Sequence, residues 1–123
     1  MIIGIGTDII QTERIAKGME SSGFKEKVFS RNEILYCEKK ANSVESFAAR
    51  FAAKEAFFKA LGTGWRGGMA FNEVQVTNDE LGKPSIELLG ETQTIVQKRE
   101  IKSIHLSLSH VKEMAIATVI LEG

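Results

Sequence analysis

The sequence lacks the features of a disulfide-bonded protein, a nucleic-acid binder or a membrane protein. Its 123 residues include one cysteine, Cys37, so no disulfide can form within the chain. The 16 basic residues are balanced by 16 acidic ones, whereas a general nucleic-acid binder shows a basic excess. The longest strongly apolar run, Met114–Leu121, is far shorter than the roughly 20 residues that span a bilayer. These absences favour a cytoplasmic protein without nucleic-acid or membrane partners.

Repeats, linkers and low-complexity segments are also missing, and the length suits one domain over residues 1–123. The first residues carry no basic region before their apolar ones, so we expect no signal peptide. Cys37 lies in a predicted helix without a histidine nearby, which favours a packing role, and a single cysteine fits a reducing compartment.

The stretch Ser46–Gly64 (SFAARFAAKEAFFKALGTG) is predicted to be a helix with a glycine-rich end, because six alanines make it a strong helix former. At the helical period its phenylalanines and its alanines fall on different sides, and neither side is polar. Four charged residues nevertheless lie among them: Arg50, Lys54, Glu55 and Lys59. An exposed Glu55–Lys59 ion pair is the ordinary explanation. The missing solvated face favours a functional site instead.

Residues 2–10 (IIGIGTDII) have the apolar content and length of a buried strand. Alternation places Gly4, Gly6 and Asp8 on one face, and glycine within a strand often marks the close approach of another backbone or a ligand. The alanine side of the predicted long helix is the natural partner for this bare face. Docking the two would bring Asp8 toward Glu55.

A short amphipathic helix is expected next, over 12–19 with Thr12 as its N-cap, and on the alternative view Asp8 belongs only to the turn before it. A second short element follows over 24–29. Between positions 14 and 31 there are five cations and two acids, with apolar side chains among them. This surface suits docking of an acidic protein, although a plain solvated face is the alternative. The proposed docking residues are Arg14, Lys17, Met19, Phe24, Lys25 and Val28.

The remaining segments complete an α+β pattern. Ser30 and Glu33 form a capping box for a helix over 31–40, and Ser43 and Ser46 are capping candidates for the long helix. The later elements are a hairpin of strands over 71–77 and 84–89, a helix over 91–100, and strands over 104–109 and 113–121. We therefore expect an α+β fold in which a small antiparallel or mixed sheet wraps around and beside one long central helix.

Some motifs are weak when taken alone. The glycines of 62–68 can bring backbone N–H groups to phosphate, but P-loop spacing is absent and glycine also ends helices. His105 and His110 are not a zinc pair, because one cysteine is present and HExxH spacing is not. A Ser109–His105–Asp8 triad can be assembled on paper, but no nucleophile elbow supports it.

Three motifs together are far more specific. The opening GIGTDI, the central FAAKEAFFKALGTG and the late HLSLSHVKEMAIA resemble the holo-acyl-carrier-protein synthase family, the small 4′-phosphopantetheinyl transferases. The resemblance covers nearly the whole chain in the right order, and it implies the 4′-phosphopantetheinyl transferase-like fold. It also implies a Mg²⁺-dependent enzyme of fatty acid biosynthesis. Such an enzyme transfers the 4′-phosphopantetheine of coenzyme A to a serine of apo-acyl carrier protein and releases adenosine 3′,5′-bisphosphate.

The resemblance further implies roles for single residues. Asp8 and Glu55 match the family's two magnesium ligands, which suits a cation that prefers oxygen and few protein carboxylates. Lys59 matches the lysine that holds the diphosphate, so Asp8, Glu55 and Lys59 are the implied catalytic residues. The implied coenzyme A-binding residues are Arg50, Lys59, Gly62, Thr63, Ser109 and His110. The serine proton would pass either to Glu55 or to a metal-bound water.

The family is similar to half of the longer, pseudo-twofold surfactin-type transferases, so a chain this short should build its site between subunits, and the resemblance implies a homotrimer. Acyl carrier proteins are strongly acidic, which favours docking over plain solvation for the basic surface. Two other classes stay open. One is a non-catalytic coenzyme A- or carrier-binding module, which would not need both carboxylates. The other is a metal-dependent hydrolase that releases the bisphosphate without a protein acceptor.

Overall fold

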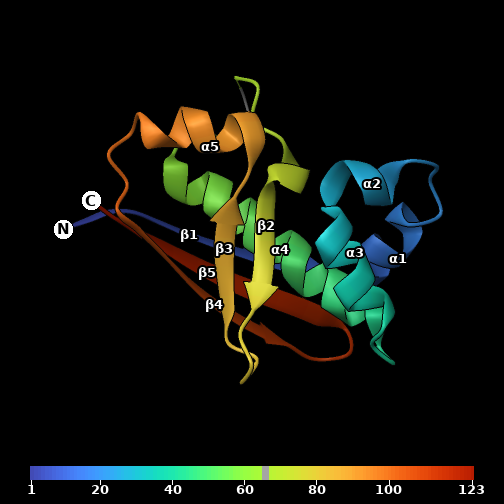
Figure 1. Cartoon of the computed structure of the whole chain (residues 1–123). Coiled ribbons are helices and arrows are strands. Elements are labelled where there is room, and N and C mark those ends of the chain that lie inside the picture. The colour runs from blue at the N-terminus through green and yellow to red at the C-terminus, as the bar shows by residue number, and fades with distance from the viewer. Residues whose placement is uncertain (65–66) are drawn as a thin grey trace.

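A long helix, α4 (Ser43–Leu61), lies between a three-stranded sheet and a β-hairpin (Figure 1). The computed structural model describes residues 1–64 and 67–123. The sheet has the strand order β1–β5–β4 and is antiparallel throughout. Its strands are β1 (Ile2–Gln11), β5 (Met114–Glu122) and β4 (Ser103–His110). The hairpin pairs β2 (Val74–Asn78) with β3 (Pro84–Leu88), also antiparallel. The expected α+β fold around a long central helix is confirmed, with two antiparallel sheets.

Shorter helices surround α4. In Figure 1, three of them gather at one end of the molecule: α1 (Thr12–Gly18), α2 (Phe24–Val28) and α3 (Arg31–Glu38). The turn η1 (Phe71–Glu73) precedes β2, and α5 (Gly90–Gln97) connects the hairpin to β4. Among the residues described, no helix is long and apolar enough to cross a membrane.

Helix α4 has almost no solvent-facing side, as its composition predicts. Of its residues, only Lys59 is exposed. The ring of Phe51 stacks on Phe71 at 6.0 Å between centroids, and Phe58 meets the same ring edge-on at 5.1 Å. The opposite side packs on the sheet, against the buried side chains of Ala115, Ala117, Val119 and Leu121. Gly62 ends the helix in the left-handed conformation, with φ +81°.

Several predicted details of the helix ends are wrong. Thr12 is not an N-cap, because β1 stays paired with β5 through Gln11, and Gln11 takes the cap position without a side-chain bond. The predicted caps Ser43 and Ser46 lie inside α4, whose N-cap is Asn42. The Ser46 hydroxyl donates instead to Sγ of the buried Cys37, a contact that agrees with a packing role for the cysteine. The capping box of Ser30 and Glu33 is confirmed.

Candidate active site

The bare glycine face of β1 rests directly on α4. A Cβ atom built on Gly4 would lie 2.1 Å from the carbonyl oxygen of Ala60, and one on Gly6 would lie 2.1 Å from that of Ala56. No side chain fits at either position, so glycine is needed because the two backbones touch. The close approach predicted from the sequence is confirmed, and it fixes the distance between β1 and α4 next to Asp8.

This packing brings together three charged side chains, Asp8, Glu55 and Lys59, which we call the carboxylate cluster. The Lys59 ammonium lies 3.0 Å from Asp8 Oδ1 and also donates to the Thr7 carbonyl at 3.1 Å. Lys59 therefore pairs across to β1, and within residues 1–64 and 67–123 no Glu55–Lys59 ion pair forms. Burial, followed by the negative charge of Asp8, raises the pKa of Glu55, while Lys59 and Arg14 partly oppose the rise. Asp8 is thus close enough to Glu55 for the two carboxylates to repel each other.

The donor set of the cluster fits a hard divalent cation. Two carboxylates from different elements lie close enough to repel each other, and extra positive charge beside them would relieve that repulsion. In the part of the chain that is described, no group of three or more histidine, cysteine, aspartate or glutamate side chains gathers as a metal site. A site with so few protein ligands suits Mg²⁺, which keeps waters and substrate phosphate oxygens as its other ligands.

A second polar site, the arginine pocket, lies beside Arg50 of α4. The cavity measures about 340 Å³, and its lining includes Tyr36, Lys40, Asn78 and His110. Arg50 is buried, stacks over the Tyr36 ring at 4.2 Å and donates from Nη2 to Asn78 Oδ1. Its Nε is buried without a hydrogen-bond partner among the described residues. The Arg50 guanidinium gives the pocket positive charge, which is suited to an anion.

The other residues expected to bind coenzyme A are spread over three places. His110 lines the arginine pocket and contacts Glu45 Oε1 through Nδ1 at 3.1 Å. Ser109 is exposed and is not among the residues that line this pocket. Gly62 and Thr63 follow Lys59 at the end of α4, where the Thr63 hydroxyl donates to the Gly64 carbonyl. The predicted glycine-rich loop extends over residues 65–66, which lie outside the described residues.

The carboxylate cluster and the arginine pocket lie on opposite flanks of α4. Arg50 and Lys59 are nine residues apart, which is about two and a half helical turns, so they point to opposite sides. The sheet register agrees, because Asp8 of β1 and Leu108 of β4 both pair with Ala117 of the central strand β5. Leu108 lines the arginine pocket. Within one chain, α4 and the central strand separate the two sites.

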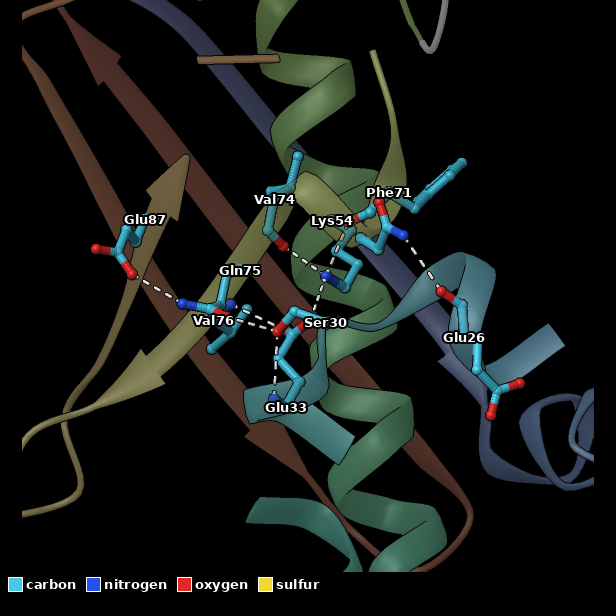
Figure 2. A network of polar contacts seen from close by, with 10 residues as sticks. Glu26, Ser30, Glu33, Lys54, Phe71, Val74, Gln75, Val76 and Glu87 are labelled. Carbon is cyan, nitrogen blue, oxygen red and sulfur yellow. Dashed lines mark hydrogen bonds and ion pairs between the residues drawn. The ribbon is translucent and has the colours of Figure 1, made fainter. Parts of the chain in front are cut away.

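A buried ion pair anchors α4 near the cluster, and sequence reasoning missed it. Lys54 is fully buried and lies 2.7 Å from Glu33 Oε1 (Figure 2). Its ammonium also donates to the carbonyls of Phe71 and Val74, so all three of its N–H groups are used. The other Glu33 oxygen accepts the Val76 amide. Together these bonds tie α3, α4 and β2 to one another. In the sequence, the one sign of this ion pair was that Lys54 lies in a predicted helix without a polar face, where a lysine needs a buried partner.

The predicted docking residues lie on and between α1 and α2. Arg14 and Lys17 are exposed, and Arg14 is close enough to Glu55 to lower its pKa. Met19 and Phe24 are partly buried against the core, whereas Val28 is buried in it. Lys25 is ion-paired with Glu38 at 2.7 Å. Of the exposed cations on this surface, Arg14 therefore borders the carboxylate cluster.

The Ser109–His105–Asp8 triad does not form. His105 Nε2 lies 2.6 Å from Glu122 Oε1, and this interaction lowers the pKa of the glutamate. Asp8 faces α4 and is held by Lys59, while His105 is exposed on β4. Successive residues of a strand point to opposite faces, and the alternation puts His105 on the face away from α4.

Fold and site together define a class of group-transfer enzymes. A model of the 4′-phosphopantetheinyl transferase superfamily matches residues 4–119. Holo-[acyl-carrier-protein] synthases of Koribacter versatilis and Clostridium tetani are 44% and 48% identical, each over 124 residues, and the matches cover at least 98% of every chain. The chain belongs to the holo-[acyl-carrier-protein] synthase family of this superfamily, so the enzyme class expected from the sequence is confirmed.

Solved structures agree with this membership. The synthase of Neisseria meningitidis superposes with a TM-score of 0.92 at 34% identity, over 100% of both chains. That of Bacillus anthracis, a complex with CoA (3′,5′-ADP), superposes with a TM-score of 0.82 at 39% identity, over 98% of this chain and 96% of that one.

Proposed function

We propose that this enzyme transfers 4′-phosphopantetheine from coenzyme A to a serine of apo-acyl carrier protein, releasing adenosine 3′,5′-bisphosphate, in fatty acid biosynthesis in the cytoplasm. The observation that carries the proposal is the carboxylate cluster. Two acidic side chains and one lysine, far apart along the chain, meet at the contact of β1 and α4. Transfer of a phosphoryl-linked group depends chiefly on positioning and on neutralising charge around phosphorus, and these groups suit that task.

Asp8 and Glu55 are proposed to hold Mg²⁺. The metal, when bound, would neutralise negative charge on the diphosphate of coenzyme A. Lys59, the exposed side chain of α4, would bind a diphosphate oxygen through its ammonium. The C-terminal turn with Gly62 and Thr63 would lie beside that group.

The arginine pocket is proposed to take the nucleotide end of coenzyme A. The buried Arg50 with its unused Nε and the Lys40 ammonium give the cavity positive charge suited to a phosphate. His110 lines the same cavity, and Ser109 precedes it on β4.

The two sites lie on opposite flanks of α4 within one chain, so we propose that one coenzyme A binds to sites from two neighbouring subunits. Association is supported by the face of the sheet that points away from α4. Its exposed apolar residues are Ile3, Ile5, Ile9, Met114 and Ile116. An apolar sheet face of this kind marks an interface. We propose the homotrimer that the family resemblance implies, with Asp8, Glu55 and Lys59 from one subunit and the arginine pocket from its neighbour.

The basic surface around α1 is proposed to dock the carrier protein. Arg14, Lys17, Met19, Phe24, Lys25 and Val28 were predicted for this role. The exposed cations among them suit an acidic partner, and Arg14 borders the cluster, so a serine delivered there would arrive next to the diphosphate.

Mass spectrometry of carrier protein incubated with enzyme, coenzyme A and Mg²⁺ tests the reaction. We expect a phosphopantetheine adduct on serine. Bisphosphate released without an adduct would indicate a hydrolase instead. Alanine variants of Asp8 and Glu55 separate catalysis from binding: we expect coenzyme A binding to survive and transfer to be lost. Transfer at the wild-type rate in both variants would show that the carboxylates are not catalytic.

Complementation tests the shared site. Asp8→Ala and Arg50→Ala chains, each inactive alone, are co-expressed and purified as mixed trimers. A site between subunits is intact when an Arg50→Ala chain supplies Asp8 and its Asp8→Ala neighbour supplies Arg50. With equal amounts of the two chains and random mixing, this holds for about one quarter of the sites, so about one quarter of wild-type activity should return. If both halves of the site came from one chain, no activity would return.

A further inference from the structure

Lys59 already serves as the counter-ion of Asp8. Its ammonium lies 3.0 Å from Asp8 Oδ1 and 3.1 Å from the Thr7 carbonyl, so two of its three N–H groups are engaged by β1. The Asp8 side chain is 15% exposed and that of Lys59 is 54% exposed. The carboxylate is therefore held in place, while the lysine reaches it from solvent on a flexible stem.

The charge of the cluster is incompletely balanced in this arrangement. The cluster holds two carboxylates and one ammonium, and Lys59 pairs with Asp8, whereas the partly buried Glu55 has no ion pair among the described residues. A divalent cation would relieve the repulsion between the carboxylates. An ammonium already on Asp8 would oppose that cation, because it occupies an oxygen of the same carboxylate and carries like charge.

We propose, building on the function proposed above, that Lys59 is an internal competitor for the metal. In the free enzyme it occupies Asp8 and keeps affinity for the metal alone low. A diphosphate offers the ammonium a doubly charged acceptor, so Lys59 leaves Asp8 and the carboxylate becomes available. Metal and coenzyme A then bind with positive coupling, and each strengthens the binding of the other by the same factor.

Binding of Mn²⁺ alone tests the first half of this proposal. Free Mn²⁺ is followed by electron paramagnetic resonance as it is titrated into the full-length protein, and no substrate or turnover is involved. We expect Lys59→Met to lower the Kd of Mn²⁺ about three- to tenfold, since a competing like charge is removed. Lys59→Arg, which keeps the charge, should stay near wild type. Lys98→Met removes one exposed lysine from the end of α5 and is the matched control for net charge. It should change nothing.

Coupling tests the second half. Saturating coenzyme A should lower the Kd of Mn²⁺ about tenfold or more in the wild type, within the usual range for coupled ligands. The factor should be several times smaller in Lys59→Met, where only direct contact between the metal and the diphosphate remains. Binding of Mn²⁺ to free coenzyme A is measured in a titration without protein and subtracted. If Lys59→Met binds Mn²⁺ no more tightly than Lys98→Met does, Lys59 does not compete with the metal for Asp8. If coenzyme A lowers the Kd of Mn²⁺ by the same factor in the wild type and in Lys59→Met, Lys59 does not move from Asp8 to the diphosphate.

Asp8→Asn separates this proposal from the metal site on which it depends. If Asp8→Asn loses Mn²⁺ binding while Lys59→Met does not tighten it, the metal site stands and the competition is wrong. If Asp8→Asn still binds Mn²⁺ like the wild type, Asp8 is not a metal ligand, and the proposed competition between Lys59 and the metal is refuted as well.

Discussion

Gly6→Ala should move Asp8 away from Glu55 by a distance that follows from the structure. The added Cβ would lie 2.1 Å from the Ala56 carbonyl oxygen, whereas ordinary contact begins at 3.4 Å, so β1 and α4 must separate by about 1.3 Å. Overpacking of this kind costs about 1–3 kcal/mol of stability. A shift near 1 Å at reacting groups can cost about 10²-fold in rate. We therefore expect the transfer rate at saturating substrates to fall about a hundredfold.

Gly4→Ala is the matched control. Its Cβ would meet the Ala60 carbonyl oxygen at the same 2.1 Å, but Gly4 lies two residues farther from Asp8 along β1. We expect a similar loss of stability in thermal unfolding, with a loss of transfer rate below about tenfold. The reasoning is refuted if folded Gly6→Ala protein transfers phosphopantetheine at the wild-type rate, or if the two variants lose activity equally.

Three further predictions concern stability, pH and the metal. Lys54→Met leaves the buried Glu33 carboxylate without its ion-pair partner and should lower the free energy of unfolding by about 3–5 kcal/mol in denaturant titrations, whereas adding Glu33→Leu should restore only part of it, because the Ser30 and Val76 amides then lose their acceptor. The pKa of Glu55 is raised in the folded chain, so the folded state holds that proton more tightly and stability falls as pH rises through this pKa. Glu55→Gln should therefore stabilise the protein by about 0.5–1 kcal/mol at neutral pH, and this gain should vanish below the unfolded pKa; a gain that is constant with pH would contradict it. Chelation with EDTA should abolish transfer without changing the circular dichroism spectrum, and Mg²⁺ should restore it; full activity in EDTA would exclude the proposed metal ligands.

The contact between β1 and α4 was predictable because it depends on periodicity alone. Two glycines on one face of a strand and a row of alanines on one side of a helix each lack bulk, and two flat surfaces can approach closely. The position of Asp8 beside Glu55 follows from that approach. The motifs around these residues also identified the family, which the comparisons bear out.

The partner of Lys54 was not predictable in the same way. Glu33 lies 21 residues earlier, in another helix, and its role in the capping box gave it a sufficient local explanation. Both roles are real, because Oε1 accepts the Ser30 amide as well as the Lys54 ammonium. The predicted N-cap of α1 was wrong for a related reason. Local propensity favoured Thr12, but pairing of β1 with β5 extends to Gln11 and fixes where the helix begins.

Helix α4 combines a well-packed body with one exposed charge. Close backbone contact with β1 on one side, stacked phenylalanines on another and the Lys54–Glu33 pair fix its position and rotation. Lys59 is its one exposed side chain and makes its contacts through a flexible stem. The proposed site, which would bind a cation together with a diphosphate, needs fixed carboxylates and a cation that can change partners. Asp8 on β1 and Glu55 on α4 are the two carboxylates, and Lys59 is the exposed cation, so the movement expected on substrate binding is that of a single side chain rather than of the helix.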